Sequence, residues 1–153
     1  MTAYLCEVKE QPAQLTLSVR TWTPVQDLPD VLGQAFGAVA HYLADLGEQP
    51  AGPPFTIYYN MDMQNLDVEM GFPVARGLPG KGEIQASQIS GGKFATCLHT
   101  GPYSEVGQAY SALSAWMQEN KHEPTGIAYE MYLNDPSETP PEALQTQIMF
   151  PLK

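Results

Sequence analysis

A single glutamate stands inside an apolar run and is the first candidate for chemistry. The run 127–133 reads Ile-Ala-Tyr-Glu-Met-Tyr-Leu, so that Glu130 lies close to Tyr129 and Tyr132. A charged side chain is rarely left in such surroundings unless it has a partner. Two roles fit it: an exposed glutamate on an open sheet face, or a counter-charge at the floor of an aromatic pocket. In the second role the tyrosine rings attract a cation through their quadrupole, and a partly desolvated carboxylate strengthens that attraction.

Histidines and glycine-rich segments indicate no second catalytic centre. His99 suits a general base because imidazole titrates near neutral pH, but its place before Gly101 and Pro102 favours a hydrogen-bonded residue at a strand end. The histidines and carboxylates lack the spacing of metal ligands, so we expect neither a metal nor a cofactor. The chain has no Gly-x-Ser-x-Gly motif, and residues 77–82 lack the spacing of a phosphate-binding loop.

The two cysteines and the N-terminus indicate the compartment. Cys6 and Cys97 lie far apart in the sequence and outside any Cys-x-x-Cys spacing, which favours two reduced thiols at strand positions over a disulfide framework or a zinc site. Residues 1–7 lack the basic and apolar regions of a signal peptide. No apolar run approaches the roughly 20 residues that span a bilayer. We therefore expect a cytoplasmic protein.

Composition and charge describe one acidic globular domain. The chain has 153 residues, of which 43% are hydrophobic and 16% charged, and its formal net charge is −10. A core of this size folds without disulfide or metal staples. The seven basic residues are scattered, whereas a protein that binds nucleic acid needs a basic patch to displace counterions from phosphates. We expect no direct binding to nucleic acid, and the acidity by itself identifies no partner.

The chain repeats itself. An offset of 74 residues sets 30–60 beside 104–134 without a gap, an offset of 78 pairs 66–74 with 144–152, and an offset of 79 pairs 19–21 with 98–100. An ordered series of matches over most of the chain indicates a duplication. It predicts a single domain over residues 1–153, with a first module at about 1–76 and a second at about 82–153.

Each half has the same order of elements. Strand-like stretches at 14–22 and 93–100 come first, and helices follow at 27–47 and 104–121, where apolar residues recur every three or four positions. Ser104 is expected to cap the second helix, and Asp30 or Asp27 the first. Two strands close each half, at 55–60 with 66–74 and at 128–134 with 144–152. This order predicts an α+β fold: a tandem pseudo-twofold repeat of strand–helix–strand–strand units, with a mostly antiparallel curved sheet, helices on one face and a ligand groove between the halves.

Alternation along the strands divides side chains between the core and the groove, because successive residues face opposite sides. The more apolar set is assigned to the face under the helices, and it comprises Phe55, Ile57, Tyr59, Tyr129, Met131 and Leu133. The other set is assigned to the groove, and it comprises Thr56, Tyr58, Asn60, Glu130, Tyr132 and Asn134, with the carboxylates Asp67 and Glu69. The groove is thus expected to be rich in aromatic rings and to contain carboxylates.

Two segments of the second half carry a resemblance to a known family. They read His-Thr-Gly-Pro-Tyr at 99–103 and Tyr-Glu-Met-Tyr-Leu-Asn-Asp-Pro at 129–136. Over essentially its whole length the chain resembles the GyrI-like family, the effector-binding domain of multidrug-sensing regulators of the MerR and AraC types. The resemblance implies tandem SHS2 modules, which are strand–helix–strand–strand units, with a drug pocket between them. Residues 1–11 are too short for a helix-turn-helix domain, so a stand-alone member is expected.

The resemblance also implies a ligand class. In sensor members the glutamate that matches Glu130 faces bound lipophilic cations amid aromatic residues. We therefore expect binding or sequestration of lipophilic, often cationic, aromatic molecules, with the broad selectivity of a multidrug or xenobiotic site. The expected ligand-binding residues are Trp22, Tyr58, Glu69, Tyr103, Trp116, Glu130 and Tyr132.

Two other functions stay open, so the sequence does not decide whether the protein is an enzyme. Some stand-alone members are similar to hydrolases that open strained cyclopropane rings of DNA-alkylating natural products. In that case Glu130 is the candidate general base and Glu69 the second, while Tyr103 and Tyr132 are candidate donors to the developing oxyanion. Others are described as gyrase-inhibitory, so an acidic surface that binds a protein partner is a further alternative. Binding without turnover is preferred.

Overall fold

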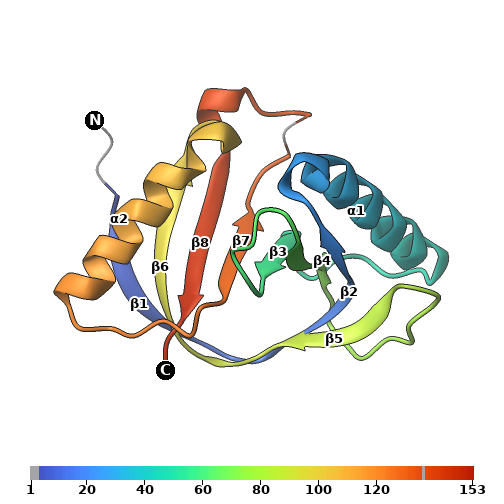
Figure 1. The fold of residues 1–153 in the computed structure, drawn as a ribbon. Helices are drawn as coiled ribbons and strands as arrows, with labels where there is room; N and C mark the ends of the chain where they lie inside the picture. The colour runs from blue at the N-terminus through green and yellow to red at the C-terminus, as the bar shows by residue number, and fades with distance from the viewer. Residues whose placement is uncertain (1–3, 136) are drawn as a thin grey trace. The chain divides into compact units, whose positions relative to one another are not determined.

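The computed structural model describes residues 4–135 and 137–153. The first three residues of the N-terminal segment and the last residue of the 129–136 motif lie outside the described residues. The described residues form two compact units, one comprising residues 12–91 and the other residues 4–11 with 92–153. Each unit contains one α-helix and four strands. Figure 1 labels these elements along the chain.

The unit of residues 12–91 is an antiparallel sheet packed against one helix. Its strands follow the order β3-β4-β2-β5, and α1 packs on β2 and β4. The elements are β2 (Gln14–Thr23), a 3₁₀ turn (Val25–Asp27), α1 (Leu28–Asp45), β3 (Phe55–Tyr58), β4 (Leu66–Pro73) and β5 (Gln85–Ile89).

The second unit repeats this arrangement. Its strands follow the order β1-β6-β8-β7, and α2 packs mainly on β6. The elements are β1 (Cys6–Gln11), β6 (Gly92–Thr100), a 3₁₀ turn (Tyr103–Glu105), α2 (Val106–Glu119), β7 (Ala128–Tyr132), a 3₁₀ turn (Pro141–Ala143) and β8 (Gln145–Pro151).

The two units confirm the α+β fold and the duplicated order of elements. The series β2, α1, β3, β4 corresponds to β6, α2, β7, β8, with the same neighbours in each sheet. Each edge strand pairs with a strand of the other half of the chain. β1 comes before β2 in the sequence but pairs with β6, and β5 comes before β6 but pairs with β2. The N-terminal strand therefore completes the sheet of the C-terminal unit.

One offset in the predicted repeat is wrong by a residue. Thr16 pairs with Pro73, and Phe94 pairs with Pro151, so β2 and β6 correspond at an offset of 78 rather than 79. Side chains alternate between faces along a strand, so a one-residue slip assigns each of them to the opposite face. Thr21 therefore corresponds to His99, and Val19 to Cys97.

Both helices begin later than the sequence suggests. A proline in extended conformation, Pro24 or Pro102, opens a 3₁₀ turn before each helix, because its ring fixes φ near the required value. Asp27 and Glu105 then occupy the N-cap positions of α1 and α2, and neither side chain makes a capping hydrogen bond. The predictions of Ser104 and Asp30 as caps are therefore wrong.

The division of the β3 residues between the two sheet faces is also opposite to the prediction. Leu66, Val68 and Met70 pack with Ala35 of α1, and Tyr58 packs against the same cluster. Thr56 is paired with Met70, and partners in register share a face, so Thr56 and Tyr58 lie under the helix. Phe55 and Ile57 face the other side yet are only 1% and 2% exposed. Because both sheet faces are buried here, polarity does not distinguish them.

Candidate functional site

Glu130 lies on the face of its sheet that α2 covers. It is paired with Ile148 of β8, which is paired with Cys97 of β6, so the three side chains share a face. The Cys97 Sγ lies 3.7 Å from the carbonyl oxygen of Ala109 in α2. The glutamate is only 8% exposed, so it is not the exposed residue of an open sheet. The prediction that it faces away from the helices is wrong.

Two tyrosines hold the carboxylate. The Tyr132 hydroxyl donates to Oε1 of Glu130 at 2.9 Å, and the Tyr110 hydroxyl donates to Oε2. Tyr132 comes from the same strand, two residues further on, whereas Tyr110 reaches down from α2. Hydrogen bonds to both oxygens fix the carboxylate in one orientation between strand and helix.

The electrostatics of Glu130 are dominated by burial. Desolvation raises the pKa of its carboxyl, while the hydrogen bonds from Tyr110 and Tyr132 and the nearby His99 act in the opposite direction. Among the ion pairs formed by the described residues, none includes Glu130. Among the described residues, the site is thus a desolvated carboxylate with two hydroxyl donors and no ion-pair partner, and His99 is an ionisable base nearby.

Thr146 adds an unfilled hydrogen-bonding group to the same face. It lies between Tyr132 and His99 in register, it is 0% exposed, and its Oγ1 has no hydrogen-bond partner among the described residues. His99 is already engaged, with Nδ1 3.0 Å from the Tyr4 hydroxyl and Nε2 3.0 Å from the carbonyl oxygen of Pro102. The prediction of His99 as a hydrogen-bonded strand-end residue is confirmed. An unsatisfied buried hydroxyl is costly, and a ligand that bonds to it would relieve that cost.

Tyr103 supplies a third aromatic ring. Its ring meets that of Tyr132 edge to face, with centroids 5.7 Å apart, and its side chain is 37% exposed. Burial raises the pKa of its hydroxyl, and the charges of Asp135 and Glu130 add to this effect. The structure therefore brings together three of the predicted residues: Tyr103, Glu130 and Tyr132.

Three more of the predicted residues belong to the unit of residues 12–91. Tyr58 belongs to the other unit and packs under α1. Glu69 lies on the opposite face of that sheet, where the Ser18 and Tyr59 hydroxyls each donate to it at 2.5 Å. Trp22 is paired with Asp67, on the Glu69 face, and is 59% exposed. Contrary to the prediction, neither Glu69 nor Trp22 shares a face with Tyr58.

Trp116 lies near the C-terminal end of α2 and packs against a residue beyond the helix. Its ring stacks on that of His122, with centroids 5.3 Å apart, just beyond the end of α2. Six residues along a helix correspond to about 240° of rotation, so Trp116 projects from a different side of α2 than Tyr110. Its assignment to the ligand site stays a prediction that this geometry does not favour.

Tyr110 and Thr146 were not predicted as site residues. A comparison of the two halves contains the signal that would have found them. At the offsets of the repeat, Phe36 becomes Tyr110, Thr56 becomes Glu130 and Val68 becomes Thr146. The face under α2 thus has one acidic group, and hydroxyl groups at two positions where the face under α1 has Phe36 and Val68.

The burial of Glu130 makes stability depend on pH. Below its ordinary pKa of 4.5 the carboxyl is neutral in both the folded and unfolded states. As the pH rises, the unfolded chain ionises first, because the folded-state pKa is raised, and this favours unfolding until the folded-state pKa is passed. We expect the free energy of unfolding of the wild type to fall relative to that of Glu130→Gln between pH 4 and 8. Denaturant titrations across this range measure it, and a difference that does not change with pH would contradict the expectation.

Within the described ranges, no group of three His, Cys, Asp or Glu side chains is arranged to hold a metal ion. In the same part of the chain, no helix is long and apolar enough to cross a membrane.

Solved structures share the fold. The C-terminal domain of EcmrR is 23% identical, with a TM-score of 0.84, and the alignment covers 99% of each chain. In a complex with DNA, the longer EcmrR chain is 24% identical with a TM-score of 0.85, and the alignment covers 98% of this chain but 57% of that one. The chain thus spans little more than half of the length of that EcmrR chain.

Two more distant structures have named ligands or activities. SAV2435 bound to tetraphenylphosphonium is 10% identical with a TM-score of 0.70, and the alignment covers 97% of this chain and 94% of that one. A hydrolase from Listeria innocua is 15% identical with a TM-score of 0.68, covering 97% and 91%. At these identities the likeness shows a common fold.

The family itself is shown by the sequence. No curated protein matches the chain significantly. The model of the GyrI-like small molecule binding domain, however, matches residues 6–153. This match includes every strand and both helices described above. The chain belongs to the GyrI-like family of small-molecule-binding domains.

Proposed function

We propose that this protein binds lipophilic aromatic cations, with Glu130 as the counter-charge. The observation that carries the proposal is a carboxylate only 8% exposed that has two tyrosine donors and no cationic partner among the described residues. A carboxylate in this state loses hydration without gaining an ion pair, so a cation that reaches it is bound more strongly than one at the surface.

The surrounding side chains favour a flat or ring-bearing ligand. Tyr103 and Tyr132 present one ring edge to the face of the other, and aromatic faces attract both apolar rings and positive charge. The hydroxyl of Thr146 offers one directional hydrogen bond beside them. A single charge with stacking surfaces imposes few geometric demands, which supports broad selectivity. The tetraphenylphosphonium named with the structurally similar SAV2435 is a molecule of this class.

A pair of ligands with the same shape and opposite charge tests this proposal. Tetraphenylphosphonium and tetraphenylborate differ chiefly in the sign of their charge, so their apolar contributions to binding nearly cancel. Isothermal titration calorimetry of the wild type is expected to give an affinity at least tenfold higher for the phosphonium, because the borate would be repelled by Glu130. Equal affinities, or tighter binding of the borate, would contradict a carboxylate-centred site.

Hydrolysis of strained cyclopropanes is the second candidate, and the raised pKa of Glu130 favours it. A carboxyl whose pKa lies closer to neutrality than usual is a better proton acceptor. In such a reaction water would attack a ring carbon of a cyclopropane conjugated to a dienone while Glu130 takes the proton of the water. The electrons of the breaking C–C bond would pass into the dienone and give an enolate. Tyr103 and Tyr132 are the predicted donors to that enolate. The Tyr132 hydroxyl already donates to Glu130, so the geometry favours Tyr103. The geometry does not favour Glu69 as a second base, because it lies on the face of its sheet away from α1.

Turnover separates the two candidates. A cyclopropane-bearing alkylator would be incubated with substoichiometric protein, and ring-opened product would be followed by chromatography. Our preferred function predicts conversion no faster than in buffer. Product exceeding one equivalent of protein, and reduced in Glu130→Gln, would instead establish a hydrolase.

A further inference from the structure

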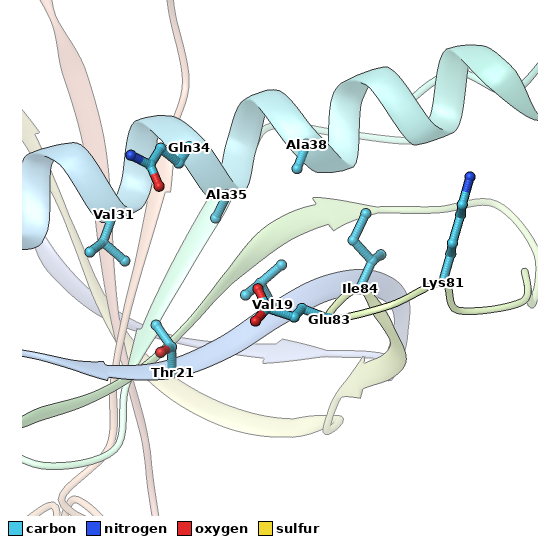
Figure 2. Close-up of a pocket in the computed structure, with 9 residues that line it drawn as sticks. All are labelled: Val19, Thr21, Val31, Gln34, Ala35, Ala38, Lys81, Glu83 and Ile84. Carbon is cyan, nitrogen blue, oxygen red and sulfur yellow. The ribbon is translucent and has the colours of Figure 1, made fainter.

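A groove runs along one side of α1 in the unit of residues 12–91. Its volume is about 450 Å³, within the range of small-molecule sites. Figure 2 shows α1 above it, β2 below it and the segment before β5 at one end. The lining residues are Val19, Thr21, Val31, Gln34, Ala35, Ala38, Lys81, Glu83 and Ile84.

The groove exists because β5 covers only part of the edge of β2 beneath α1. β5 pairs with β2 only from Gln14 to Ser18, whereas β2 continues to Thr23. Within this unit, no strand pairs with β2 on that side beyond Ser18. The side chains that α1 projects over the gap at Ala35 and Ala38 are single methyl groups and do not fill it.

The exposed edge of β2 offers peptide hydrogen bonds. The carbonyl oxygen of Leu15 accepts from the Val74 N–H at 2.9 Å, on the side of β2 that faces β4. Backbone groups alternate between the two edges of a strand, so those of Arg20 and Trp22 point to the uncovered edge. The backbone groups of two residues at alternate positions have the same spacing as those of an extended peptide, so such a peptide can form hydrogen bonds to both.

Opposite charges stand at one end of the groove. Lys81 and Glu83 belong to a turn closed by two backbone hydrogen bonds between Lys81 and Ile84, at 2.8 and 3.0 Å. Their side chains leave the turn in different directions, as Figure 2 shows. In the described part of the chain neither of them forms an ion pair, and the Lys81 Nζ lies 5.9 Å from the centre of the Tyr42 ring. Lys81 can therefore bind an anionic group of a ligand while Glu83 binds a cationic group at a different position.

We propose that this groove is a second binding site, which takes a zwitterionic dipeptide with apolar side chains. The peptide amide would pair with the uncovered edge of β2, and one side chain would lie among Val19, Val31 and Ile84. The carboxylate would meet Lys81 and the ammonium group Glu83, while Gln34 and Thr21 offer further hydrogen bonds. A lipophilic monocation would use only Glu83 and leave Lys81 without a counter-charge, whereas a zwitterion matches both.

The site is tested by titrating L-valyl-L-leucine into ¹⁵N-labelled protein. We expect saturable shifts of backbone amide signals confined to β2, α1 and residues 81–84. The same dipeptide acetylated at its N-terminus and amidated at its C-terminus should bind roughly two- to fivefold more weakly for each charge removed, the factor typical of exposed ion pairs. Shifts spread over both units, or none at 20 mM, would overturn the proposal, as would equal affinity for the blocked dipeptide.

Variants link the binding to the groove. Ala38→Phe places a ring in the groove from an exposed helix position and should weaken binding at least tenfold without unfolding the protein. Lys81→Gln and Glu83→Gln should each weaken the binding of the zwitterionic dipeptide but not that of the blocked dipeptide. Glu130→Gln is the matched control and should leave dipeptide binding unchanged. Unchanged affinity in Ala38→Phe, with the fold intact in the same spectra, would also overturn the proposal.

Discussion

Replacement of Glu130 by glutamine is expected to lower the affinity for tetraphenylphosphonium by roughly 5- to 150-fold, the equivalent of about 1–3 kcal/mol for a desolvated charge interaction. Glutamine keeps the size of the side chain and can still accept from Tyr110 or Tyr132, so the change removes mainly the charge. Calorimetric titration of both proteins over a series of pH values measures the difference.

Controls separate charge at the site from charge on the protein. Glu142→Gln removes one exposed negative charge from the same unit and is expected to leave the affinity unchanged. The affinity of the wild type should rise with pH as the raised pKa of Glu130 is passed, and that of Glu130→Gln should not. An equal affinity in wild type and Glu130→Gln would remove this residue from the proposed site.

Replacement of Gly71 by alanine is expected to destabilise the fold by about 3 kcal/mol or more, at the upper end of overpacking effects. Gly71 lies in β4, where a β-carbon would stand 2.0 Å from the carbonyl oxygen of Leu17 and 2.7 Å from the Cα of Ser18. These are backbone atoms of the neighbouring strand, so no side-chain rotation relieves the clash. The strand pairing itself would have to shift. Denaturant unfolding followed by circular dichroism measures the loss.

Gly37 provides the matched control for this substitution. It lies within α1, and a β-carbon added there would have no atom within 4 Å. Gly37→Ala should therefore stabilise the protein by about 0.5–1 kcal/mol, through the better helix propensity of alanine. A Gly71→Ala protein as stable as the wild type would mean that β2 and β4 are not paired in this register.

Much of the fold could be predicted from the sequence because the same order of strands and helix occurs in both halves of the chain. The helical periodicity around Val39 and Leu113 and the matched apolar strands occur in both halves at a nearly constant offset. The pairing of β1 with β6 could not be predicted, because an edge strand of either half satisfies the same alternation. The helix starts were misplaced because a proline-initiated 3₁₀ turn precedes each of them.

The candidate site was predicted in part. Glu130 stood out because it is a charge in an apolar strand, and Tyr132 lies two residues away on the same face. Tyr110 was hidden in a helix stripe that serves packing equally well, and Thr146 looks like an ordinary strand residue. Glu69 shows the converse: it has the same residue type and comparable burial, yet Ser18 and Tyr59 satisfy it on the other face of its sheet. The register of a strand determines on which face of the sheet such a glutamate lies, and residue types alone do not reveal the register.

A crystal structure of the protein with tetraphenylphosphonium would show where the cation binds. We expect the phosphorus centre within about 6 Å of the Glu130 carboxylate, the range over which cations interact with aromatic faces. Phenyl rings should then contact Tyr103 and Tyr132. A phosphonium bound with full occupancy away from Glu130, or density for none at saturating concentration, would contradict the proposed function.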